Sequence, residues 1–260
     1  MAREYFAGID VGSLSTEAVI IDENANLVAY SIRATGINSS AAAAAGLEAA
    51  LQQANLERTD LQRLVATGYG RAAVAGAAKQ MTEITCHAVG ARHLFPAVRT
   101  VIDIGGQDAK VIHLAADGQL VDFAMNDKCA AGTGRFLEVM AQRLEVDLDQ
   151  LGDMALQAEK AVTISSTCTV FAESEVVSLV ARNHPRAEIV RGLHVAIVNR
   201  VWSQVQTVGI HGQVAMTGGV ARNRGVVKLL EQRLGLDLQI HSEPQIVGAL
   251  GAAVLARKIN

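Results

Sequence analysis

One short pattern occurs twice in the chain, and it constrains the fold more than any other feature. Residues 8–20 read GIDVGSLSTEAVI and residues 101–112 read VIDIGGQDAKVI, so that Asp10 corresponds to Asp103. In each copy an apolar strand ends in Ile-Asp, a glycine-containing turn follows, and further strands lead into helical sequence. Chance repetition is the alternative, but the matching strands on both sides argue against it. The repeat predicts a duplicated, two-lobed α/β fold.

The first of the two turns has the composition of a phosphate site. Its small residues Gly12, Ser13, Ser15 and Thr16 let backbone N–H groups and hydroxyls converge on an anion. Asp10 stands where it could hold a hydrated cation. An Asp-x-Gly-Ser turn is by itself more often only a turn. Because the motif recurs, the two turns would face each other across a cleft and grip one polyphosphate from both sides.

Two cysteines stand just before helical sequence. The stretch NDKCAAGTGRF carries Cys129 ahead of the turn Gly132-Thr133-Gly134, and the stretch SSTCTVFAESEV carries Cys168. A helix start offers unpaired N–H groups and a partial positive charge, which favour a phosphate or a thiolate. The first of these turns could therefore touch both a nucleotide and a metal centre. A lone cysteine at such a place is more often an inert buried thiol.

The third cysteine, Cys86, precedes His87 inside a helix expected over residues 83–95. Adjacent helix positions point to different faces, so this pair cannot chelate one ion well. We therefore expect Cys86 in the core. His184 and His194 each stand alone and are expected to be surface residues or hydrogen-bonded structural residues.

The remaining segments are expected to alternate between strands and helices. Ser39 and Ser40 are expected to cap an alanine-rich helix, and residues 72–80 are expected to be helical. A buried strand at 214–216 leads into the turn TGGVARN, and a last strand is expected at 238–240. The Thr-Gly-Gly turn would let a planar ring or a ribose lie against bare backbone.

The composition excludes several classes of protein. The chain has 260 residues, of which 50% are hydrophobic, enough to bury a core in each of two lobes. Its 23 basic and 26 acidic residues give no basic excess, so no nucleic-acid partner is expected. The sequence opens without a leader pattern and its uncharged runs are too short to span a bilayer, which favours a cytoplasmic protein with no membrane partner. Three widely spaced cysteines argue against a disulfide framework.

Three turns, GIDVGSLST, DIGGQDAK and TGGVARN, match the actin, Hsp70 and sugar-kinase superfamily. More specifically, the blocks ATGYGR, KQMTEITCHAVGA, MNDKCAAGTGRFLEVMA and SSTCTVFAESEV resemble the activator (component A) of 2-hydroxyacyl-CoA dehydratases. Relatives of that activator are the ATPase subunits of benzoyl-CoA reductase and the reductase of double-cubane cluster proteins. The resemblance covers essentially the whole chain. It implies the duplicated actin-like (ribonuclease H-like) fold, with a first nucleotide-binding lobe of residues 1–95 plus 246–260 and a second lobe of residues 96–245 that carries the cluster cysteines.

The resemblance implies an ATPase that donates single electrons. Such a protein is an oxygen-sensitive homodimer with one 4Fe-4S cluster between its subunits, and ATP hydrolysis drives an electron to a partner iron–sulfur dehydratase or reductase. A ferredoxin or flavodoxin would be the electron donor. Cys129 and Cys168 would be the cluster ligands, since a cluster usually needs four thiolates and two-fold symmetry presents each cysteine twice. A zinc site within one subunit would fall short of ligands, and two purely structural cysteines are the third reading.

The same resemblance implies which residues bind ATP and Mg. Asp10 and Asp103 would hold Mg through water, and Gln107 or Asp103 would orient the attacking water. The phosphates would lie at the first two turns and the adenosine near the Thr-Gly-Gly turn. Residues of four turns would contact the nucleotide: Gly12, Ser13, Leu14 and Ser15; Gly105, Gly106 and Gln107; Gly132, Thr133 and Gly134; and Gly218, Gly219, Val220 and Asn223.

One position departs from the family pattern. The first turn of the family often carries a lysine after its Ser/Thr run, and this chain has Glu17 there. The sequence does not assign the missing role to Lys110. The alternative function is a sugar- or acetate-type kinase of the same fold, but a kinase needs a general base beside a substrate hydroxyl and has no use for two thiolates at helix starts. No motif identifies the electron acceptor, so a reductase of double-cubane proteins is a further alternative.

Overall fold

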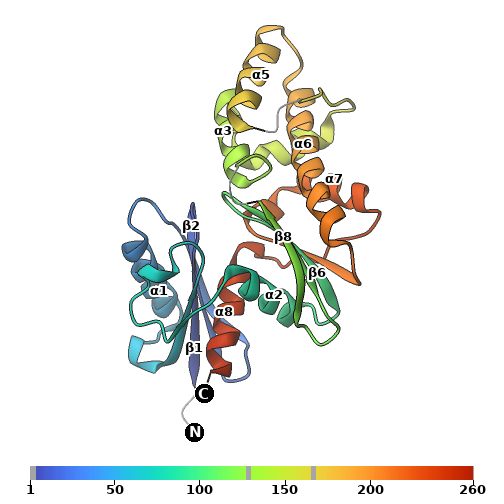
Figure 1. The fold of residues 1–260 in the computed structure, drawn as a ribbon. Coiled ribbons are helices and arrows are strands. Elements are labelled where there is room, and N and C mark those ends of the chain that lie inside the picture. The colour runs from blue at the N-terminus through green and yellow to red at the C-terminus, as the bar shows by residue number, and fades with distance from the viewer. Residues whose placement is uncertain (1–3, 127–129, 165–167, 260) are drawn as a thin grey trace.

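Two β-sheets, one for each copy of the repeat, form the framework of the molecule (Figure 1). The structure is a computed structural model that describes residues 4–126, 130–164 and 168–259. The first sheet has the strand order β3-β2-β1-β4-β5, with Tyr5–Val11 (β1), Ser15–Asp22 (β2), Leu27–Ala34 (β3), Leu61–Thr67 (β4) and Lys79–Gln80 (β5). The second has the order β8-β7-β6-β9, with Val98–Ile104 (β6), Ala109–Leu114 (β7), Leu120–Asn126 (β8) and Gln213–Thr217 (β9).

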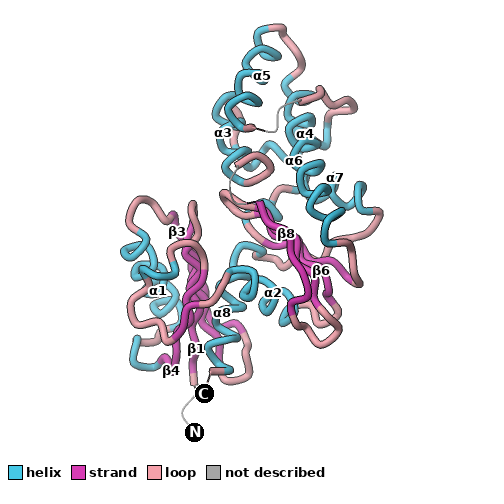
Figure 2. Tube along the Cα trace, in the orientation of Figure 1, coloured by secondary structure: helices cyan, strands magenta, loops and turns pink. Residues whose placement is uncertain are grey.

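The helices fall into two groups, one between or beside the sheets and one beyond the second sheet (Figure 2). The first group is Ser39–Ala54 (α1), Glu83–Leu94 (α2) and Val247–Lys258 (α8). The second group is Gly134–Leu144 (α3), Leu151–Gln157 (α4), Thr169–Ala181 (α5), Arg186–Val208 (α6) and Arg224–Leu234 (α7). None of the helices described here combines the length and the apolar composition needed to cross a membrane.

The structure confirms the repeat and extends it beyond the hairpins. β1 is antiparallel to β2 and parallel to β4, and β6 is antiparallel to β7 and parallel to β9. Asp10 therefore faces Glu17 on one neighbouring strand, as Asp103 faces Lys110. On the other neighbouring strand each aspartate faces a threonine followed by a glycine, Thr67-Gly68 for Asp10 and Thr217-Gly218 for Asp103.

Those two glycines occupy equivalent positions, where any side chain would be strained by the backbone conformation and would clash with an aspartate. Gly68 and Gly218 both have a φ of 85°, in the region that favours glycine. An added Cβ would lie 2.4 Å from Asp10 Oδ1 at Gly68 and 2.8 Å from Asp103 Oδ1 at Gly218. Each Thr-Gly pair thus brings bare backbone against the carboxylate of its own sheet.

Helices α2 and α8 lie between the two sheets and connect them (Figure 1). They cross at glycines: a Cβ added to Gly90 would lie 2.1 Å from Val247 O, and one added to Gly251 would lie 1.8 Å from Cys86 O. α8 packs on β1, whereas α2 packs on β6. Cys86 is fully buried with residues of α8, which confirms the expectation that it belongs to the core.

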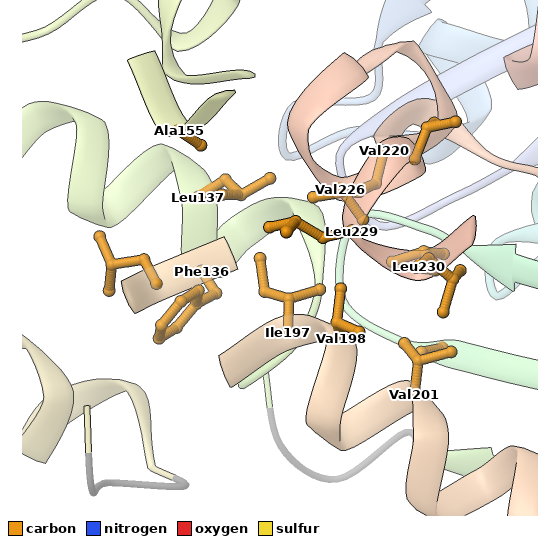
Figure 3. Close-up of a cluster of buried hydrophobic side chains, with 14 of the residues drawn as sticks. Phe136, Leu137, Ala155, Ile197, Val198, Val201, Val220, Val226, Leu229 and Leu230 are labelled. Carbon is orange, nitrogen blue, oxygen red and sulfur yellow. The ribbon is translucent and has the colours of Figure 1, made fainter. Parts of the chain in front are cut away.

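The second sheet is covered on both faces, and its strands alternate accordingly. On β7, Val111 points into the core shared with α6, whereas Ile112 packs with residues of α2. The larger core lies on the α6 side, where Phe136 of α3, Ile197 of α6 and Leu230 of α7 converge (Figure 3). This core fixes α3, which begins beside the second hairpin.

Three local expectations were wrong. Asn38, not a serine, caps α1, because its Oδ1 accepts a 3.0 Å hydrogen bond from Ala41 N. Residues 72–80 form no α-helix: Arg71–Ala73 is only a short 3-10 helix, Gly76 has a φ of 72°, and the backbone N–H of Ala78 donates to β4. Residues 238–240 form no strand, because only Gln239 of this segment bridges to β9.

The fold places the C-terminal helix with the N-terminal strands. α8 packs against β1, β2 and β4 of the first sheet, although it follows the whole second sheet in sequence. This is the arrangement expected if residues 246–260 belong to the first lobe. The exact lobe boundaries, 1–95 plus 246–260 and 96–245, stay a prediction.

Candidate functional site

A cavity of about 660 Å³ lies where the two hairpins approach each other. Most of the residues predicted to bind nucleotide or Mg line it: Asp10, Gly12, Ser13, Leu14, Ser15, Asp103, Gly105, Gly106, Gly134, Gly218, Gly219, Val220 and Asn223. Three predicted residues are not part of the lining: Gln107, which is exposed, and Gly132 and Thr133, which are buried. The proposed water-orienting role of Gln107 thus has no support from its position.

The two hairpins have the same turn and touch each other. Gly12 N donates to Ser15 O at 2.9 Å, and Gly105 N donates to Asp108 O at 3.0 Å. The side chain of Leu14 packs on Gly106, because a Cβ added to Gly106 would lie 2.7 Å from Leu14 Cγ. Leu14 is therefore a contact between the hairpins as well as part of the cavity wall.

The start of α3 differs from what the sequence suggested. The N–H groups of Gly134 and Arg135 were expected to be available to an anion. They donate instead to Gly105 O at 2.9 Å and to Gly106 O at 2.8 Å. The helix start thereby holds the second hairpin in place. Gly134 still lines the cavity, so a ligand there would meet backbone whose donors are already used.

Asp103 is buried and surrounded by donors. Its Oδ2 is 3.0 Å from Lys110 Nζ, and its Oδ1 accepts a 2.7 Å hydrogen bond from Thr217 Oγ1 and lies 3.2 Å from His87 Nδ1. Burial by itself would raise the pKa of Asp103, but His87, Lys110 and Thr217 together lower it to about 2. Asp103 is therefore ionised at neutral pH.

Asp10 occupies the equivalent place but has the opposite electrostatic environment. Its Oδ2 lies against the first turn of α8, since a Cβ added to Gly248 would be 2.1 Å away, and 3.7 Å from His87 Nε2. Burial, and then the nearby charge of Glu17, raise the pKa of Asp10 to about 8. Burial prevails at Asp10, which has Glu17 on the neighbouring strand, whereas at Asp103 it is offset by His87, by Lys110 on the equivalent strand and by Thr217.

Lys110 is a fully buried cation beneath the cavity. Its Nζ lies 3.0 Å from Asp103 Oδ2, 2.9 Å from Asp108 Oδ2 and 3.5 Å from Glu83 Oε2. Burial opposes its charge, but these three carboxylates raise the pKa of Lys110 above its ordinary value. Burial also raises the pKa of Glu83 to about 8, against the opposing effect of Lys110.

Glu17 is tied to the segment that leads into α8. Gln245 Nε2 donates hydrogen bonds of 2.8 Å to Ser15 Oγ and 2.8 Å to Glu17 Oε1. Burial raises the pKa of Glu17 to about 7 in spite of these bonds. Gln245 follows Pro244, whose carbonyl accepts a 3.0 Å hydrogen bond from Gly218 N. This short segment therefore contacts both the first hairpin and the Thr-Gly-Gly turn.

The far wall of the cavity is formed by the segment after β9. Arg222 Nε donates to Glu243 Oε1 at 3.0 Å, and a second hydrogen bond joins the same two side chains. Asn223 caps α7: its Oδ1 accepts from Val226 N at 3.0 Å and lies 3.1 Å from His194 Nε2. His194 is buried and also bonds to Val190 O, which confirms the expectation of a hydrogen-bonded structural histidine.

The structure describes only one of the two predicted cluster ligands, Cys168. Cys129 lies outside the described residues. Cys168 is half-buried at the N-cap of α5, as expected for a cysteine at a helix start. Within residues 4–126, 130–164 and 168–259, no three His, Cys, Asp or Glu side chains are arranged to hold a metal ion. A cluster ligated within these residues of one subunit is therefore not supported.

Sequence reasoning named Glu17 and Lys110 but gave neither a role in the site, and it missed Glu83, His87 and Gln245. Aligning the two hairpins would have placed Glu17 and Lys110 beside equivalent aspartates. Glu83 and His87 are one helical turn apart on α2, a spacing that puts both on one face. Gln245 gave no signal, because its partners lie on a hairpin at the other end of the sequence.

Comparisons with known proteins agree on one family. Residues 7–256 match the BadF/BadG/BcrA/BcrD ATPase family. The 2-hydroxyisocaproyl-CoA dehydratase activator of Clostridioides difficile is 44% identical over 97% of this chain and 94% of its own length. The (R)-2-hydroxyglutaryl-CoA dehydratase activating ATPase of Acidaminococcus fermentans is 47% identical over 98% of this chain and 97% of its own length.

Solved structures agree with the sequence matches. The A. fermentans component A superposes with a TM-score of 0.93, covering 98% of each chain at 47% identity. The C. difficile activator with bound ADPNP also has a TM-score of 0.93, at 44% identity, covering 98% of this chain and 94% of that one. A glucokinase from Streptomyces griseus shares only the fold, with a TM-score of 0.58 at 14% identity over 98% of this chain and 100% of that one. The predicted actin-like and sugar-kinase-like fold is thus confirmed.

Proposed function

The chain belongs to the BadF/BadG/BcrA/BcrD ATPase family, and from that premise we propose that it is an ATP-dependent activator that passes single electrons to a partner iron–sulfur enzyme. One observation carries the ATPase part of the proposal. Two equivalent aspartates, one from each sheet, stand with their glycine hairpins around a single cavity. Related activators of dehydratases extend over nearly the same length.

The donor set of the cavity fits a Mg–nucleotide complex. Carboxylates are the ligands that Mg prefers, and Mg keeps several of its waters, so Asp10 and Asp103 would hold it through water. Mg held there would supply positive charge that offsets the charge of the phosphates. The cavity is lined by five carboxyl groups, those of Asp10, Glu17, Glu83, Asp103 and Asp108, and by the cations Arg33, Lys110 and Arg222. Burial raises the pKa values of Asp10 and Glu83 to about 8, so a divalent cation arriving with the polyphosphate would favour the ionised form of Asp10 and offset the charge of Asp103.

The hairpins supply the phosphate contacts, and the Thr-Gly-Gly turn supplies the nucleoside contact. Gly12 and Gly105 let the backbone approach the phosphates closely. Gly218 and Gly219 leave bare backbone next to Val220, where a flat base or a ribose can lie. Asp103 is the better candidate for orienting the attacking water, because it is ionised and part of the cavity lining, whereas Gln107 is exposed beside it.

The electron-transfer part rests on the two cysteine motifs. Cys129 and Cys168 of two copies would together supply four thiolates to one 4Fe-4S cluster at a two-fold axis. When bound, such a cluster accepts and donates one electron at a time. The exposed apolar face of α5 supports a subunit contact next to Cys168: it consists of Val170, Phe171, Val177 and Val180, which are 66%, 69%, 53% and 37% exposed.

The partner would be an iron–sulfur dehydratase. The relatives that are 44% and 47% identical activate 2-hydroxyisocaproyl-CoA and (R)-2-hydroxyglutaryl-CoA dehydratases. A reductase of the benzoyl-CoA or double-cubane type is the alternative acceptor, and a ferredoxin or flavodoxin would be the donor. Incubation of the chemically reduced protein with ATP and each purified acceptor would distinguish these acceptors by which one becomes reduced.

The test of the ATPase proposal compares Asp103→Asn with a matched control. Asp103→Asn should lower kcat for Mg-ATP hydrolysis by about 100-fold or more, because it removes a fixed charge from the reacting centre. Asp117→Asn, in the exposed turn between β7 and β8, should leave kcat unchanged. Thermal unfolding should show that both variants are folded. Wild-type turnover in the Asp103 variant would refute the assignment.

A further inference from the structure

His87 is in contact with both halves of the repeated site. Its Nδ1 lies 3.2 Å from Asp103 Oδ1 and 3.1 Å from Thr217 Oγ1, both in the second sheet. Its Nε2 lies 3.7 Å from Asp10 Oδ2, in the first sheet. The side chain is 7% exposed and lines the cavity. One imidazole ring thus spans the space between the two aspartates.

The ring is placed by a rigid element. His87 is on α2, which is locked to α8 by the close contacts at Gly90 and Gly251. α8 approaches the same ring, because a Cβ added to Gly248 would lie 2.8 Å from His87 Nε2. On its two sides α2 is packed into the cores of both lobes, through Cys86 towards the first and Ala88 towards the second. If the two sheets moved relative to each other, α2 could therefore keep its packing on only one of them.

The hydrogen-bonding pattern assigns a role to each ring nitrogen. Thr217 Oγ1 donates to Asp103 Oδ1, so its lone pairs are available to a donor. A proton on Nδ1 can then be shared between Thr217 and Asp103. Nε2 is left with its lone pair towards Asp10, at a distance too long for a direct hydrogen bond. A water held by a cation between the lobes could donate hydrogen bonds to both Nε2 and Asp10 and so join the two side chains.

We propose that His87 is a positioning residue that holds Asp103 and Asp10 in register across the lobes, so that the Mg–nucleotide complex meets both carboxylates at once. This rests on the proposed ATPase function. His87 itself need not contact the nucleotide. Its contribution is to fix the orientation of Asp103 through Nδ1 and the spacing to Asp10 through Nε2. Groups of this kind typically change metal affinity or activity by roughly 10- to 100-fold when they are removed.

Three substitutions of His87 and one of Thr217 test the two contacts. His87→Ala removes both. His87→Asn can present an amide near the position of Nδ1, and His87→Gln can present one near the position of Nε2, so each can restore one contact. His93→Ala is the matched control, because His93 is exposed on the same helix. Thr217→Val leaves α2 unaltered but removes a hydroxyl that both accepts from Nδ1 and donates to Asp103.

Two measurements are made on each variant: ATP hydrolysis as a function of Mg concentration, and calorimetric ADP binding with Mg and with EDTA. His87→Ala should lower kcat by roughly 10- to 100-fold, raise the Mg concentration for half-maximal rate, and weaken ADP binding only when Mg is present. His87→Asn and His87→Gln should be intermediate, and Thr217→Val should be impaired at least as much as His87→Gln, because it also removes the hydrogen bond that Thr217 donates to Asp103. His93→Ala should match the wild type in every measurement.

Two results would overturn the inference. One is a His87→Ala variant with the Mg dependence and the Mg-linked ADP affinity of the wild type. The other is an equal loss of ADP affinity with Mg and with EDTA, together with a lowered Tm, which would make His87 a structural residue only. If the wild type hydrolyses no ATP, the proposed function fails, but the Mg-linked binding of ADP still decides the role of His87.

Discussion

Replacing Lys110 by methionine should destabilise the nucleotide-free protein more than any surface change. Lys110 is 1% exposed and holds Asp103, Asp108 and Glu83 at 3.0, 2.9 and 3.5 Å. Methionine keeps an unbranched apolar side chain, one atom shorter than that of lysine, but not the charge, so the buried carboxylates lose their counter-charge. Removing one partner of a buried ion pair costs about 3–5 kcal/mol. At roughly 2–4 °C per kcal/mol for a chain of this size, Tm should fall by about 6–20 °C.

The assay is thermal unfolding followed by circular dichroism without nucleotide. Lys228→Met is the matched control, because Lys228 also pairs with a carboxylate, Glu231, but is 57% exposed, and its Tm should not change measurably. Asp103→Asn combined with Lys110→Met should recover part of the loss, since one of the unpaired charges is then absent. A Lys110→Met protein with the Tm of the wild type would show that the buried charges are not held by Lys110, and the reasoning would be wrong.

Three further predictions concern other parts of the molecule. Because the pKa of Glu17 is raised from 4.5 to about 7 by burial, its stabilising contribution is complete below about pH 4.5 and lost as the pH rises through 7. Between pH 4.5 and 7, the free energy of unfolding, measured with urea, should therefore fall less for Glu17→Gln than for the wild type. An equal fall in both proteins would contradict this prediction. Gly251→Ala should lower the free energy of unfolding by about 1–3 kcal/mol, because the new Cβ would lie 1.8 Å from Cys86 O. The control is Gly46→Ala on α1, where an added Cβ makes only ordinary contacts and should not destabilise the protein. Equal unfolding midpoints of the two variants would refute the account of the helix crossing. Anaerobic iron analysis should find iron lost in Cys168→Ala and kept in Cys86→Ala, since burial raises the pKa of Cys86 to about 12, and the reverse pattern would exclude the proposed ligands.

The repeated hairpin was the part of the fold that the sequence predicted best. Strand, turn and strand are adjacent in the chain, so local patterning defines each copy, and the recurrence of Ile-Asp-x-Gly places the copies in equivalent positions. Asp10 and Asp103 consequently line one cavity, as expected. The same local reasoning failed for residues 72–80, where alanine favours helix but Gly76 and hydrogen bonds to β4 decide the backbone.

The charges around the aspartates could not be predicted, because they depend on tertiary packing. His87 and Glu83 look like ordinary positions of a short helix until α2 is placed between the sheets. Lys110 could be aligned with Glu17, but its three partners come from α2 and the second hairpin together. The start of α3 shows the same limit: its free N–H groups, expected from helix geometry, are used by the carbonyls of Gly105 and Gly106.

The most direct test of the account asks whether ATP hydrolysis, rather than nucleotide binding, allows electron transfer to a partner. The anaerobic protein would be chemically reduced and mixed with a 2-hydroxyacyl-CoA dehydratase and either ATP or ADPNP, and reduction of the acceptor would be followed by electron paramagnetic resonance. We expect reduction with ATP, none with ADPNP, and none with ATP when Asp103 is replaced by asparagine. Equal reduction of the acceptor under all three conditions would contradict the proposed coupling of hydrolysis to electron transfer.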